Sequence, residues 1–237
     1  MINKKLAEKV EMVMRFTFIC MTILAIVYSI FSIDDDTVNW EGITSLFIAL
    51  ILFILPTIFL KRTRLKIPVT FQIFFLLFIF ASLYLGEMHN FYYRYTWWDS
   101  MLHSTSAIML AYIGFLLIFT LNRDQNIHLN LSPFFIALFS FCFAVAMGAL
   151  WEIFEYLVDA LVGSNMQKAR NLETIYGFFD TRLGVRDTMK DMIENTIGAL
   201  FVSVIGYYYC KKKMIKDNTF WRLKDQFIED NPDLFKK

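Results

Sequence analysis

The feature that most constrains the fold of this chain is a series of six long apolar runs. Runs of about 18 residues can cross the hydrocarbon core of a bilayer as helices. They lie near residues 13–33, 43–60, 69–86, 100–121, 133–158 and 188–209. The composition agrees: 57% of the 237 residues are hydrophobic and 19% are charged, more apolar surface than a soluble fold can bury. The sequence predicts an all-α, polytopic membrane helix bundle of about six transmembrane helices.

The orientation of the bundle is predicted from lysine and arginine, because cytoplasmic connections retain basic residues during insertion. Basic clusters precede the first run, fill the second connection and follow the sixth run: Lys4, Lys5, Lys9; Lys61, Arg62, Arg64, Lys66; Lys211, Lys212, Lys213, Lys216. The first connection is acidic instead, with Asp34, Asp35, Asp36 and Glu41. The fifth connection, 160–186, is basic in part but long and also acidic, so the stronger clusters decide. We expect both termini in the cytoplasm and the chain in the plasma membrane.

The chain divides by composition into a bundle and a tail. Residues 1–213 are predicted to form a single transmembrane helical domain, and residues 214–237 a cytoplasmic amphipathic tail. In the tail Phe220, Leu223 and Phe227 follow one another at helical spacing. A partly disordered tail is the alternative. The cysteines (Cys20, Cys142, Cys210) have no paired or zinc-type spacing, which favours reduced packing residues.

Three of the predicted spans carry ionisable side chains, which are costly inside a bilayer. In each span the polar residues and glycines recur at helical spacing and so share one face. The sets are Asp99, His103, Ser106; Gly148, Glu152, Glu155, Asp159; and Asp187, Asp191, Asn195, Gly198, with Glu194 beside the last. Because consecutive spans run in opposite directions, all three sets reach the extracytoplasmic end. They predict an outward-facing acidic and histidine pocket, floored by close helix packing at Gly148 and Gly198.

Neighbouring carboxylates in such a pocket need a cation or protons between them. A divalent metal (Mg, Mn, Ca or Zn) is one solution, and its candidate ligands are Asp99, His103, Glu152, Asp187 and Asp191. Shared protons, a cationic ligand, or an arginine of the fifth connection (Arg182, Arg186) are other solutions. In an enzyme, His103 or Glu155 is the candidate general base. Glu155, Asp159, Glu194, Asn195 and Ser106 are candidate supporting or binding groups.

Each of these residues also has a plain structural interpretation. Asp99 and Asp187 suit the first turns of helices, where acidic groups complement the helix dipole. Glu155 and Asp159 suit the membrane interface, and a single buried histidine is more often hydrogen-bonded than a ligand. The aromatic run at residues 91–98 is typical of an interfacial belt; holding a lipid or sugar headgroup is its alternative role.

The segments WDSMLH, GALWEIFE and RDTMKDMIENTIGA carry a resemblance to a known group of proteins. Their order resembles the pattern of the VanZ-like and YjdF-like bacterial membrane proteins, with the YjdF-like branch the closer match. The likeness covers roughly residues 95–205, and the glutamine that usually follows the glutamate segment in VanZ-like proteins is not evident. VanZ-like members are linked to glycopeptide tolerance. The resemblance implies a shared site at Asp99, His103, Glu152, Asp187, Asp191, Asn195 and Gly198, without naming its chemistry.

Three functions remain open at this point. The first is a membrane protein whose pocket binds a cation and acts on or recognises a lipid-linked or cell-envelope ligand. The second is a small ion- or proton-coupled transporter, although polar residues are confined to the outer half of the spans. The third is a non-catalytic protein whose polar cluster fixes helix register. Membrane lipids are the expected partners, nucleic acid is not, and the oligomeric state is not predicted.

Overall fold

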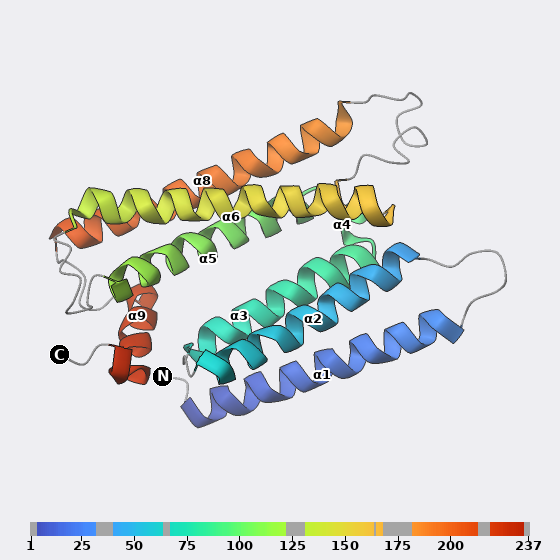
Figure 1. Cartoon of the computed structure of the whole chain (residues 1–237), viewed down its shortest axis with the longest axis horizontal. Helices are drawn as coiled ribbons and strands as arrows, with labels where there is room; N and C mark the ends of the chain where they lie inside the picture. Colours follow the sequence, from blue (N-terminus) through green and yellow to red (C-terminus); the bar gives the residue numbers. More distant parts are fainter. Residues whose placement is uncertain are drawn as a thin grey trace. The chain divides into compact units, whose positions relative to one another are not determined.

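All the secondary structure that the structure describes is helical. The structure is a computed structural model that describes residues 4–31, 40–63, 67–121, 131–163, 165–167, 182–212 and 219–234. The predicted runs correspond to helices α1 (Lys4–Phe31), α2 (Trp40–Thr63), α3 (Val69–Ile79) continued by the π-helix η1 (Phe80–Met88), α5 (Trp98–Leu121), α6 (Pro133–Val162) and α8 (Leu183–Lys212). The short helices are α4 (Phe91–Arg94), α9 (Thr219–Asp230) and η2 (Pro232–Leu234) (Figure 1).

Four of the described helices are long and apolar enough to cross a membrane. The stretches are Glu8–Val27, Val69–Gly86, Trp98–Ile118 and Pro133–Leu161, and α2 contains the shorter apolar stretch Leu46–Leu55. Helix α8 has 30 residues, as α6 does. It is not among these four helices, and its first turns carry several charged residues. The chain is therefore an all-α, multi-pass membrane helix bundle, as its sequence predicts.

The ends of α6 follow from local sequence. Ser132 caps its first turn, and its hydroxyl accepts a hydrogen bond from the backbone N–H of Phe135. Pro133 occupies the first helical position, where no N–H is needed. At the other end Gly163 takes a left-handed conformation with φ 81°, which suits glycine because it has no Cβ. These signals give α6 a length of 30 residues, so that Glu152, Glu155 and Asp159 all lie within the helix.

By their internal contacts the residues form two compact units. The first comprises residues 1–98 and 217–237, and the second residues 99–216. The core of the first unit is a cluster of buried apolar side chains on α2, α3 and η1: Ala49, Phe53, Leu76, Ile79 and Leu83. Partly buried apolar side chains of α1 pack against this cluster. The prediction of one transmembrane domain over residues 1–213 stays a prediction.

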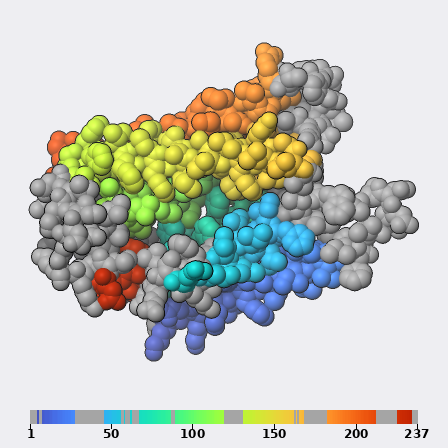
Figure 2. Space-filling view, viewed as in Figure 1, coloured from blue at the N-terminus to red at the C-terminus, as the bar shows by residue number. Residues whose placement is uncertain are grey.

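The second unit, which holds the site, is built from α5, α6 and α8. Figure 2 shows α6 and α8 side by side along one face of this unit. Glycines let the three helices pack closely: a Cβ on Gly114 of α5 would lie 2.9 Å from Cα of Ser140 on α6. A Cβ on Gly198 of α8 would lie 3.0 Å from the carbonyl oxygen of Ser104 on α5. Such close contacts fix the rotation of each helix about its axis.

The segments that carried much of the orientation argument lie outside the described residues. They include Asp34, Asp35, Asp36, Arg64, Lys66, Lys213 and Lys216, and most of the fifth connection. The cytoplasmic placement of both termini therefore stays a prediction. A helix does form in the tail, where α9 buries Phe227; the side chains of Phe220 and Leu223 are outside the description.

Candidate metal centre

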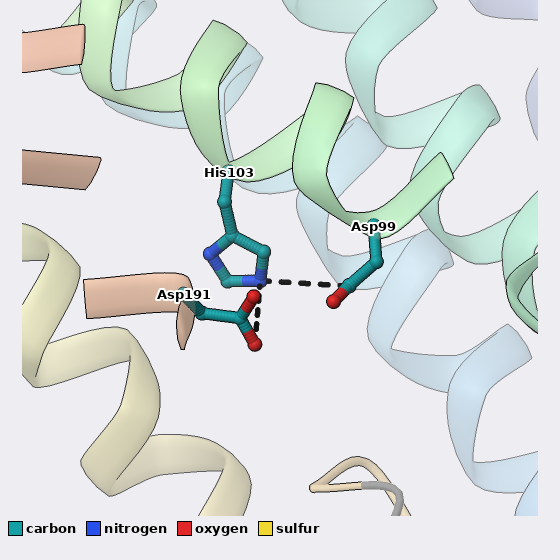
Figure 3. A group of neighbouring side chains, drawn as sticks. All are labelled: Asp99, His103 and Asp191. Carbon is teal, nitrogen blue, oxygen red and sulfur yellow. Dashed lines mark ion pairs between the residues drawn. The ribbon is translucent and has the colours of Figure 1, made fainter. Parts of the chain in front are cut away.

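His103 is the centre of the cluster that the second unit assembles. It lies one turn below Asp99 on α5, and its ring points between Asp99 and Asp191 of α8 (Figure 3). His103 is 7% exposed and Asp191 only 1%. The cluster is thus formed by two helices whose sequence positions are about ninety residues apart, and it lies at the polar, N-terminal ends of both.

The distances within this group are longer than those of direct hydrogen bonds. Nε2 of His103 lies 3.6 Å from Oδ1 of Asp99 and 3.6 Å from Oδ2 of Asp191. Direct hydrogen bonds between such groups span about 2.7–3.2 Å. The three atoms offered by these residues all lie within 4.8 Å of one another. Ligand atoms about 2.1 Å from a tetrahedral ion are separated by about 3.4 Å, close to both measured separations.

The opposite ring nitrogen of His103 faces different groups. Nδ1 lies 3.8 Å from Oε1 of Glu152 on α6 and 3.4 Å from the amide nitrogen of Asn195 on α8. Glu152 and Asn195 are both buried. The hydroxyl oxygen of Ser106 lies 2.8 Å from the carbonyl oxygen of His103 and 3.4 Å from Oδ1 of Asn195, and its single hydrogen can be donated to either acceptor. The imidazole is therefore held between helices, with one nitrogen toward Asp99 and Asp191 and the other toward Glu152.

The glycines predicted to pack beneath the carboxylates lie at this site. A Cβ on Gly148 of α6 would lie 2.8 Å from the side-chain nitrogen of Asn195. Gly198 packs against Ser104 and Ala107 of α5. The small residues thus let the backbones approach where the polar groups meet.

Several predicted site residues lie outside the Asp99, His103 and Asp191 group. Glu155 accepts a 2.7 Å hydrogen bond from the indole nitrogen of Trp151. Asp159 accepts hydrogen bonds from the backbone N–H groups of Met166 and Gln167, at 2.7 and 2.9 Å. Asp159 thereby fastens the chain that follows α6. Asp187 is partly buried one turn before Asp191 on α8.

Lys190 belongs to the cluster although the sequence did not single it out. Its ammonium lies 3.7 Å from Asp99, 3.7 Å from Asp191 and 3.6 Å from Glu194. Its side chain is 43% exposed, so it lies at the solvent-accessible edge of the group. The signal was present: Lys190 is a charged residue inside the sixth predicted span, where every charge needs a partner.

The cluster has the composition of a divalent metal site. Two carboxylates and an imidazole suit Zn, while carboxylate oxygens suit Mg, Mn or Ca. Three protein ligands also leave coordination positions for water or a substrate, as in catalytic metal sites. A protonated His103 between two carboxylates is the other arrangement that these distances allow.

Comparison with known proteins identifies the family. The family described as "Predicted membrane protein (DUF2238)" matches residues 13–212. The chain belongs to this family. The DUF2238 match extends into both units and includes every residue of the cluster. A Thermotoga maritima protein described as "Uncharacterized protein" is similar, with 25% identity over 169 residues, 70% of this chain and 74% of that protein. No solved structure matches. The comparisons support a membrane protein family and do not name the VanZ-like or YjdF-like proteins.

Proposed function

We propose that this membrane protein binds a divalent cation through Asp99, His103 and Asp191. The observation that carries the proposal is the approach of three ligand atoms from two helices to within 4.8 Å of one another. Asp191 is a second support: its Oδ1 is buried, accepts no hydrogen bond from the part of the chain that the structure describes, and lies 3.7 Å from the ammonium of Lys190. A buried carboxylate oxygen without a hydrogen bond is costly, and a bound cation would offset that cost.

Glu152 has a different role in this proposal from the one its sequence pattern indicates. It faces Nδ1 of His103, whereas Nε2 faces the other two ligands. A carboxylate beside the non-ligating nitrogen of a metal-bound histidine commonly orients the ring and raises its basicity; at 3.8 Å Glu152 would act on the imidazole through its charge, because the two atoms are too far apart for a direct hydrogen bond. Glu152 therefore positions His103 rather than contacting the ion.

We propose that the molecule recognised at this ion is a lipid-linked or cell-envelope molecule. Asp99 is partly exposed, with 18% of its side chain accessible, so a bound ion would be reachable from one side. Apolar side chains cover the outer faces of α6 and α8, among them Leu150, Ile153, Ile193 and Ile197. A molecule with a polar group at the ion and apolar chains along these helices fits both features. The VanZ-like or YjdF-like resemblance is consistent with an envelope role and stays a prediction.

The test is metal binding by the purified full chain in detergent. We expect metal-free protein, prepared with a chelator, to bind about one Mn²⁺ or Zn²⁺ per chain in titration calorimetry. Asp191→Asn should abolish that binding. Because asparagine has the shape of aspartate without its charge, the variant should keep the fold.

The matched control is Asp225→Asn, which removes a carboxylate from the exposed surface of α9. It should bind the ion as the unmodified chain does. Equal binding by the unmodified chain and Asp191→Asn, or no binding by a folded chain, contradicts the proposal.

A further inference from the structure

Lys190 brings a positive charge into the proposed metal site. Its ammonium is shared by Asp99, Asp191 and Glu194, at 3.7, 3.7 and 3.6 Å. Asp99 and Asp191 are two of the three proposed ligands. All three distances exceed the approximately 2.7–2.9 Å of a direct charge-assisted hydrogen bond. The lysine therefore offsets part of the negative charge of the cluster without being held by one partner.

The carboxylates need this charge when no ion is bound. The side chains of Asp191 and Glu152 are 2% and 5% exposed, and buried carboxylates are strongly destabilised without a counter-ion. Among the described residues, Lys190 is the only lysine or arginine that forms an ion pair with Asp99 or Asp191. It stands beside the ligands as a tethered monovalent cation.

A bound ion would displace this ammonium. An ion between Asp99 and Asp191 would lie within a few ångströms of Nζ, and like charges repel strongly at that distance. The lysine can withdraw, because its side chain is 43% exposed and its stem is flexible. Glu194 lies four residues further along α8, where it can hold the ammonium alone.

The exchange has different results for monovalent and divalent ions. A monovalent ion that replaces the ammonium brings no additional charge to the ligands. A divalent ion brings one more positive charge, and its stronger attraction to the carboxylates offsets the loss of their contacts with the ammonium. We infer that Lys190 makes the site selective for divalent over monovalent cations, by occupying it as a built-in competitor that retreats to Glu194 when a divalent ion binds. This inference rests on the proposed function.

Lys190→Met tests the inference because it keeps the length of the side chain and removes its charge. In the unmodified chain, replacing N-methylglucamine chloride by NaCl at constant chloride should leave Mn²⁺ affinity almost unchanged. In Lys190→Met, Mn²⁺ affinity measured with N-methylglucamine should rise about tenfold or more, since a repelling charge is gone. Na⁺ should then compete and lower that affinity several-fold. Lys190→Arg, which keeps the charge, should behave as the unmodified chain does.

Lys211→Met is the control on the same helix. Lys211 is exposed and its ammonium lies 5.5 Å from the ring centre of Tyr207, about 30 Å from Lys190 at 1.5 Å per residue. It should not alter Mn²⁺ affinity or its response to Na⁺.

The role of Glu194 is measured by a double-mutant cycle with Lys190. Glu194→Gln should lower Mn²⁺ affinity more in the unmodified chain than in Lys190→Met, because only the former has an ammonium to hold. Equal effects in both backgrounds overturn the retreat to Glu194.

The outcomes for the two proposals are distinct. If the unmodified chain binds no divalent ion, the proposed function fails and this inference fails with it. If it binds Mn²⁺ and Asp191→Asn does not, but Lys190→Met binds Mn²⁺ no more tightly and remains indifferent to Na⁺, only the inference is overturned.

Discussion

At the scale of residues, the two buried glutamates of α6 have different surroundings although they lie only three positions apart. Glu152 faces Nδ1 of His103 at 3.8 Å, whereas Glu155 accepts a hydrogen bond from Trp151 of its own helix. Sequence spacing places both on one face and does not distinguish them. In the structure Glu152 contacts the imidazole of His103 on α5, and Glu155 is hydrogen-bonded to Trp151.

Glu152→Gln should weaken divalent-ion binding about 10- to 100-fold, the usual effect of removing a carboxylate that orients a ligating histidine. The protein should remain folded, since glutamine has nearly the same shape. Titration calorimetry with Mn²⁺ measures the change.

Glu155→Gln is the matched control for that experiment. It keeps an oxygen that can accept the hydrogen bond from Trp151, and it should leave ion affinity within about twofold, well below the effect expected for a group beside the ligand. If the two variants weaken binding equally, the assigned role of Glu152 is wrong and a general loss of negative charge explains both.

At the scale of elements, glycines decide how α5, α6 and α8 meet. Gly114 of α5 lies against the backbone of Ser140 on α6, and the hydroxyl of Ser140 donates a hydrogen bond to the carbonyl oxygen of Ala111. Gly206 of α8 lies beneath the ring of Phe115. Without a hydrophobic driving force between helices in lipid, such contacts hold a membrane bundle together.

Gly114→Ala should destabilise the bundle by about 1–3 kcal/mol, the usual cost of overpacking, reduced by the higher helix propensity of alanine. The added Cβ would lie 2.9 Å from a backbone atom, which cannot rotate away as a side chain can. Reversible unfolding in mixed micelles, followed by circular dichroism, measures the loss.

Leu117→Ala is the comparison on the same helix, because Leu117 is 41% exposed and has fewer protein contacts to lose. It should alter the free energy of unfolding by less than about 0.5 kcal/mol, as surface substitutions usually do. A larger effect for Leu117→Ala than for Gly114→Ala contradicts the packing argument.

At the scale of the whole molecule, the proposed metal ligands all lie in the second unit, while the first unit has a polar contact of its own. Arg15 of α1 donates a 2.7 Å hydrogen bond to the backbone carbonyl of Phe53 on α2. It also pairs with Glu11 on its own helix at 2.6 Å. Three residues after Phe53, Pro56 lacks the N–H of a regular helix. The arginine thus ties α1 to α2 in the part of the helix that contains this proline.

Arg15→Met should lower the free energy of unfolding by about 1.5–3 kcal/mol, the usual contribution of a hydrogen bond from a charged group. It should leave Mn²⁺ affinity unchanged, because no proposed ligand lies in the first unit. Unfolding in mixed micelles and titration calorimetry on the same preparation test both statements. A folded Arg15→Met protein with a large change in ion affinity contradicts the assignment of the site to the second unit alone.

Much of this architecture could be predicted from the sequence. Apolar runs of membrane length become helices because backbone polar groups must be satisfied internally in lipid, and each predicted run overlaps a described long helix. The polar sets also follow from sequence, because the helical repeat alone puts residues four apart on one face. This repeat puts Asp99 with His103, and Asp191 with Asn195, on shared helix faces.

The sequence by itself therefore determined which segments are helices and which face of each is polar, since both depend on contacts between near neighbours in the chain. Only the tertiary structure decided how the polar faces meet. In it Glu152 faces Nδ1 of His103, and Asp159 accepts hydrogen bonds from the backbone of the following segment. Lys190 lies 3.7 Å from each of two candidate ligands, Asp99 and Asp191. The physical reason is that helix rotation is set by close packing between distant segments, at glycines such as Gly148 and Gly198, and no repeat within one helix encodes it.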